Sequence, residues 1–194
     1  MRQFALCIFH IAFCGLQTAL VPLPCTATND DNPSGITFSF PEQEAAKQLL
    51  SQTDAYTDTA SPFDRKVRMG VNKDPGITQY LEFVAAQVKP WTAEDQSNIQ
   101  NAISKLQSPL KNLSIKLDAP VNLIHTTGRE ESGAAYTRGN EIIFPKGELN
   151  ANAKSQTRLM AHELFHVISR HHPILRDRLY ALIGFNKANP IKLP

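Results

Sequence analysis

Apolar residues recur with a helical period in two neighbouring segments of the chain. Residues 78–88 (TQYLEFVAAQV) have apolar side chains three or four positions apart, and Pro90 follows them. Residues 92–110 (TAEDQSNIQNAISKLQSPL) repeat this spacing and begin with Thr92 and Asp95 in the spacing of a capping box. Both segments are predicted to be amphipathic helices that pack on a core. Their apolar positions are Leu81, Val84, Ala85 and Val88, then Ile99, Ile103, Leu106 and Leu110.

Beyond the second predicted helix, the spacing between apolar residues shortens. Residues 113–126 (LSIKLDAPVNLIHT) contain alternating and β-branched stretches, and residues 135–145 (AYTRGNEIIFP) are typical of a strand that ends at Pro145. A helical segment comes next, and residues 174–185 (ILRDRLYALIGF) predict one further amphipathic helix. The sequence thus predicts the α+β class, with a small mixed sheet of two or three strands packed on helices.

The N-terminal residues 1–27 differ from the rest of the chain. They hold Arg2, a long apolar run, and then Cys25 and Ala27 in the −3 and −1 places of a cleavage site. This pattern predicts a secretory signal peptide that is cut after Ala27. The alternatives are a lipoprotein acylated at Cys25 and a retained membrane anchor, because the apolar run is about long enough to span a bilayer.

The next segment, residues 28–74, is rich in Asp, Thr, Ser and Pro. It is expected to form a polar arm or linker with one short helix near residues 42–52. Residues 75–194 would then form the folded domain.

Composition limits the class of protein. The chain has 194 residues, 42% of them apolar and 20% charged, which suits one globular domain with its own core. The formal net charge of +2 does not indicate nucleic acid as a partner. All three cysteines precede the predicted cut, so the mature chain would lack disulfides. We therefore expect a secreted or periplasmic bacterial protein without a stable membrane anchor.

The stretch LMAHELFHVISRHHP, residues 159–173, carries the candidate chemistry. His162, Glu163 and His166 match the pattern H-E-x-x-H, which is a zinc signature when it lies on a helix. One helical turn separates the two histidines, so both imidazoles can reach one ion, and Glu163 can polarise a water beside it. The alternative is a buried helix whose histidines only form hydrogen bonds with neighbouring groups.

This motif, on a helix that follows a mixed sheet, resembles that of the zincin superfamily of metallopeptidases. The resemblance implies that His162 and His166 bind Zn²⁺ and that Glu163 is the general base. It also implies that the edge strand before the motif holds an extended peptide by strand addition. In this chain that strand would comprise Asn140, Glu141, Ile142, Ile143 and Phe144.

The third metal ligand is left open by the sequence. A catalytic zinc normally has three protein ligands, and no glutamate follows Glu163. The metzincin extension of the motif places His172 in the third position, although Ser169 stands where that pattern has a glycine. In a straight helix His172 would point about 280° round from His162. The alternatives are Asp177, His171, an upstream group and a ligand outside this chain.

The expected function is that of an exported zinc-dependent metallopeptidase acting on a peptide or protein, with Glu163 as general base. Tyr136, Arg138 and His125 are candidates for stabilising an oxyanion. The alternative function is a degenerate, non-catalytic zincin-like binding module of the bacterial envelope or secretome. Residues 167–194 are short for a zincin lower lobe, so the C-terminal lobe is expected to be truncated or the chain to be a fragment.

Overall fold

The computed structural model describes residues 35–111, 115–185 and 188. The predicted signal peptide, its cleavage site and all three cysteines lie outside the described residues. Within these residues, no helix is long and apolar enough to cross a membrane.

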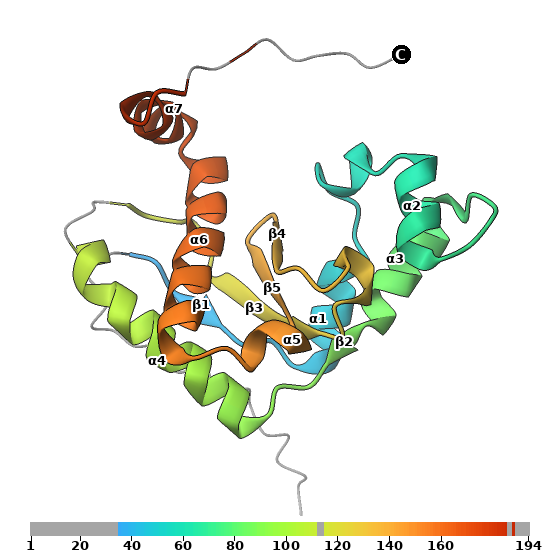
Figure 1. Cartoon of the computed structure of the whole chain (residues 1–194), viewed down its shortest axis with the longest axis horizontal. Helices are drawn as coiled ribbons and strands as arrows, with labels where there is room; N and C mark the ends of the chain where they lie inside the picture. The colour runs from blue at the N-terminus through green and yellow to red at the C-terminus, as the bar shows by residue number, and fades with distance from the viewer. Residues whose placement is uncertain (1–34, 112–114, 186–187, 189–194) are drawn as a thin grey trace, which may run out of the picture.

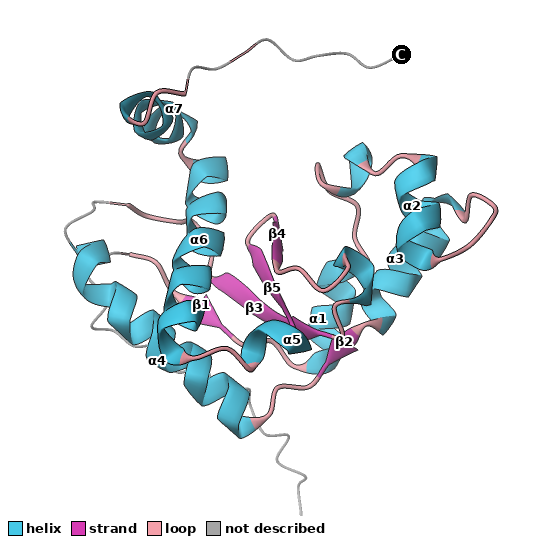
Figure 2. Cartoon of the chain, in the orientation of Figure 1, coloured by secondary structure: helices cyan, strands magenta, loops and turns pink. Residues whose placement is uncertain are grey.

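Helices and short strands are interspersed along the described chain (Figures 1 and 2). The helices are α1 (Gln43–Leu50), α2 (Pro62–Met69), α3 (Gly76–Ala86), α4 (Ala93–Lys111), α5 (Lys146–Leu149), α6 (Ala153–His171) and α7 (Pro173–Leu182). Two 3-10 turns are η1 (Thr57–Thr59) and η2 (Arg129–Glu131). The strands are β1 (Phe38–Ser39), β2 (Val88–Lys89), β3 (Val121–Thr126), β4 (Tyr136–Arg138) and β5 (Glu141–Pro145).

The strands form one mixed sheet in the order β1-β3-β5-β4, and β2 also pairs with β3. The pairs β1–β3 and β3–β5 are parallel, while β2–β3 and β4–β5 are antiparallel. The expected α+β class with a small mixed sheet on helices is confirmed. β4 ends the order of strands, so it is the edge strand beside β5.

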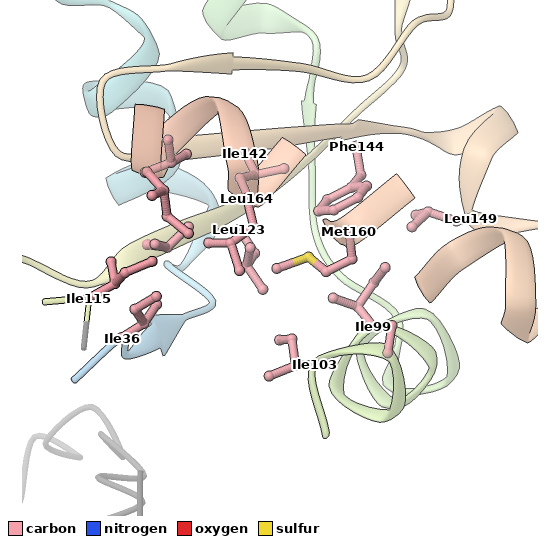
Figure 3. Packing of buried hydrophobic residues seen from close by; sticks show 14 residues of the cluster. Ile36, Ile99, Ile103, Ile115, Leu123, Ile142, Phe144, Leu149, Met160 and Leu164 are labelled. Atoms are coloured by element: carbon pink, nitrogen blue, oxygen red, sulfur yellow. The ribbon is translucent and has the colours of Figure 1, made fainter. Parts of the chain in front are cut away.

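Helices cover both faces of the sheet (Figure 1). Leu123 and Ile142, neighbours in register on β3 and β5, face a cluster that includes Met160 and Leu164 of α6 (Figure 3). The next pair along the strands, Ile124 and Ile143, faces the opposite cluster, formed with α1 and α3. Successive strand residues point to opposite faces, so both faces of β3 and β5 are buried.

The two helices expected from the apolar spacing are present as α3 and α4. The Thr92 hydroxyl accepts a hydrogen bond from the Asp95 amide at 3.1 Å, as the capping pattern predicts. α3 ends at Ala86 because Val88 turns into the sheet, where it pairs with Thr126 of β3. The helical spacing alone had included Val88 in the helix.

The segment 28–74, expected as an arm or linker, is part of the domain over its described residues 35–74. α1 lies where the short helix was expected, and β1 pairs with β3. Ile36 and Leu50 are both 0% exposed. The few apolar residues of this segment are spaced to reach the core, which its polar composition does not reveal.

Candidate metal centre and catalytic glutamate

The motif helix α6 is held by a cap at its start and by a buried side. The side chain of Asn152 accepts a hydrogen bond from the Ser155 amide at 3.0 Å, which satisfies one free donor of the first turn. Met160, Leu164 and Val167 are 0–2% exposed and pack in the cluster shared with α4 and the sheet. Their burial fixes the rotation of α6, and the motif residues therefore lie along its flank.

The two motif histidines meet at their Nε2 atoms, which are 3.0 Å apart. Their rings are nearly perpendicular, with centroids 4.6 Å apart. Two nitrogens that bind one tetrahedral zinc at 2.0–2.1 Å lie about 3.3 Å apart, so the pair fits a shared ion with a small adjustment. Burial lowers the pKa of His166, and the charges of His162 and Arg170 lower it further. A lowered pKa favours the neutral imidazole, the form that binds a metal.

Glu163 lies between the two histidines in sequence and is turned toward the protein interior. Its side chain is 4% exposed, and no described group donates a hydrogen bond to it. Burial raises the pKa of this carboxyl; His162 lowers it and Glu148 raises it. A carboxylate whose pKa moves toward neutral is a stronger base, as general-base chemistry requires.

His172, the third ligand of the metzincin pattern, is not brought to the other two histidines. α6 stays helical through His171, and the His172 Nε2 lies 2.8 Å from the backbone oxygen of Lys116. The reason is Ser169, which keeps helical geometry and donates its hydroxyl proton to the Phe165 carbonyl. Without a glycine the chain does not turn back toward the motif.

The other candidates for the third ligand are engaged elsewhere. Asp177 pairs with the neighbouring Arg176, with a closest distance of 2.7 Å. His171 contacts the side chain of Asn140 through its Nε2. No group of three or more His, Cys, Asp or Glu side chains that could hold a metal occurs in the described part of the chain. The described residues therefore fit two zinc ligands and a base, and they do not supply a third ligand.

The expected substrate strand is an inner strand. In β5, Glu141, Ile142 and Ile143 pair with β3 on one side and β4 on the other, so strand addition cannot occur there. This corrects the prediction for Asn140–Phe144. Residues 135–145 form a hairpin rather than one strand, because Gly139, with φ of 46°, turns the chain between β4 and β5. The Arg-Gly-Asn sequence itself predicts this turn, and the structure confirms it.

Arg170 is a site residue that the sequence analysis did not select. Its Nη1 donates to the backbone oxygen of Gly139 at 2.6 Å, and its Nη2 donates to the Thr137 hydroxyl at 2.7 Å. These bonds join α6 to the edge of the sheet. The four-residue spacing from His166 was the signal that could have found it.

The three candidates for oxyanion stabilisation take part in the fold. Arg138 is 2% exposed and donates to the Asp54 carboxylate at 2.9 Å and to two backbone oxygens. His125 contacts the Pro90 carbonyl through Nδ1, and Tyr136 stacks on Tyr56. These contacts supply no support for an oxyanion role.

The comparisons with known proteins bear on this same part of the molecule. Residues 124–173 match the family model of the eCIS core domain, a zincin-like, metallopeptidase-associated domain of extracellular contractile injection systems. The match begins in β3 and extends just past the end of α6, so it includes the complete motif. No curated protein and no solved structure matches the chain. The segment from the second half of β3 to the end of α6 is thus similar to the eCIS core domain.

Proposed function

We propose that the protein is an exported zinc-dependent metallopeptidase in which His162 and His166 hold the metal and Glu163 is the general base. The observation that carries the proposal is the convergence of the two Nε2 atoms at 3.0 Å on the helix that also holds the buried Glu163. The similarity of residues 124–173 to a zincin-like domain supports it. Export rests on the leader-like residues 1–27.

A zinc ion bound here would polarise the scissile carbonyl and make a water more acidic. Glu163 would accept a proton from the attacking water and pass it to the leaving amine. Its burial supports this role, because a raised pKa lets one carboxyl act first as base and then as acid. The third protein ligand would come from outside the described residues.

The peptide would lie along β4, the edge strand next to the motif helix. β4 pairs with β5 on one side, and α6 packs against β4. In a two-residue hairpin closed by Arg138 and Glu141, the backbone groups of Thr137 point away from β5. The Thr137 carbonyl already accepts from Arg170 at 3.5 Å, so its amide is the group with which an extended peptide would pair by strand addition. We therefore propose a peptide or protein as the substrate.

A second candidate function is a zincin-like binding module without catalysis. It is favoured by the lack of a three-ligand group in the described part of the chain. The buried Glu163 speaks against it, because a binding module gains nothing from an unpartnered buried carboxyl.

The Glu163→Gln variant tests the proposal. It keeps the shape of the side chain but removes the base, so we expect peptide hydrolysis to fall by about two to four orders of magnitude. Cleavage of a fluorogenic casein substrate by the full chain, with zinc supplied, is the measurement, and zinc content serves as the control. Unchanged cleavage by the zinc-loaded variant would contradict the assigned role of Glu163.

A further inference from the structure

Arg170 lies one helical turn beyond His166 on α6. His162, His166 and Arg170 are four residues apart in succession, so they follow one flank of the helix. The guanidinium is near enough for its charge to contribute to the lowered pKa of His166. A group that extends from the proposed metal centre along this flank would meet Arg170 next.

The contacts of Arg170 leave its positive charge without an acidic partner. Its hydrogen bonds go to uncharged oxygens of Gly139 and Thr137, at the edge of the sheet. Within the described residues, no carboxylate lies within 4.0 Å of it. The nearby acids are engaged otherwise: Asp54 accepts from Arg138, and Glu141 accepts from Asn122 at 3.0 Å.

Arg170 is exposed at the surface, so an anionic group can reach its guanidinium. Neighbouring protein groups desolvate part of the guanidinium and lower its pKa, while the charges of Asp54 and Glu141 raise it. A guanidinium gains more from a carboxylate than from neutral carbonyl oxygens, because charge-assisted hydrogen bonds are about twice as strong. The planar fork of arginine also matches the two oxygens of a carboxylate. A carboxylate that reached Arg170 would therefore bind more strongly than a neutral group of the same size.

We propose that Arg170 determines substrate specificity by binding a carboxylate of the peptide. The proposal rests on the peptidase function proposed above and adds a substrate class, namely acidic peptides. A peptide paired with β4 would pass Thr137, which holds the guanidinium at the edge of the sheet. The carboxylate could belong to an Asp or Glu side chain or to the peptide's C-terminus, and the test separates these two sources.

Peptide binding to the full chain carrying Glu163→Gln tests this proposal without needing hydrolysis. Fluorescence anisotropy would compare a labelled random peptide pool rich in glutamate with the same pool carrying glutamine instead. A second pair of pools differs only in a free or an amidated C-terminus. We expect about tenfold tighter binding of one carboxylate-bearing pool, and that pool identifies the source.

Introducing Arg170→Gln into the Glu163→Gln chain should abolish this preference for the carboxylate-bearing pool. Arg170→Lys in the same chain should retain part of the preference, because the charge remains. Arg176→Gln removes an equal charge on α7, where Arg176 already pairs with Asp177, and serves as the matched control. Thermal melting would show that each variant is folded.

Equal or undetectable binding of the matched pools would overturn the proposal, as would a preference that survives Arg170→Gln. Cleavage by the wild type without acid preference would contradict this inference alone. Acid-dependent binding without any hydrolysis would contradict the proposed peptidase function alone.

Discussion

At the residue scale, two glutamate side chains, Glu163 and Glu130, are buried, and burial disfavours their ionised forms. Glu163 is buried on the motif helix, where a raised pKa suits a base. Glu130 in η2 is 0% exposed, and neither of its carboxylate oxygens meets a hydrogen-bond partner. Burial raises the pKa of Glu130, the adjacent Glu131 raises it too, and the nearby Thr126 hydroxyl lowers it. The ionised form of Glu130 is therefore unfavourable in the folded state.

This predicts a pH-dependent effect of Glu130→Gln on stability. A carboxyl with a raised folded-state pKa is protonated in both states at low pH, so it then costs nothing. As the pH rises above about 4.3, the unfolded chain releases its proton first and the folded state loses stability. Glu130→Gln should therefore raise the free energy of unfolding at pH 7 and change it little near pH 4. Urea denaturation at both pH values measures this, and a destabilised variant at pH 7 would contradict it.

At the element scale, residues 35–74 of the polar N-terminal segment form part of the folded domain rather than a flexible linker. β1 extends the sheet through β3, and α1 covers the face opposite to α6 (Figure 1). The side chain of Arg138 in β4 donates to the carbonyls of Leu50, the last residue of α1, and of Gln52 just after it. α1 therefore supports the edge strand on which the substrate is proposed to bind.

Truncation of Leu50 tests whether α1 belongs to the core. Leu50 is 0% exposed, and Leu50→Ala is expected to lower the free energy of unfolding by roughly 2–5 kcal/mol. The matched control is Val67→Ala on α2, where the side chain is 61% exposed and the change should stay within about 0.5 kcal/mol. Guanidinium denaturation of both variants is the measurement. Equal effects would indicate that α1 is a loosely attached arm.

At the scale of the whole molecule, the sequence predicted the elements with strong periodicity and missed those set by long-range contacts. The apolar spacing predicted α3 and α4, and the fold class is confirmed. The polar composition of residues 35–74 did not predict that they contribute to the core, because only a few of their side chains, such as Ile36, are buried there. The β-branched stretch before Pro145 indicated that a strand was present, but the pairing of β5 with β3 joins segments that are not adjacent in sequence.

In the candidate site too, residues placed by local helical spacing were predicted, and residues placed by long-range contacts were not. Helical geometry alone brings His162 and His166 together, so spacing in sequence was enough to predict their meeting. The place of His172 depends on how α6 ends, and its contact with Lys116 joins residues 56 positions apart. Arg170 acquires its environment from the β4–β5 hairpin, which no local pattern on α6 encodes.

The zinc content of the purified full chain, measured by elemental analysis, tests the central claim most directly. We expect one tightly held zinc per chain in the wild type and in Glu163→Gln, and its loss in His162→Ala and His166→Ala. His172→Ala should keep the metal, because that side chain is turned toward Lys116. A folded wild-type chain without zinc, or zinc that survives both motif-histidine variants, would contradict the proposed metal centre.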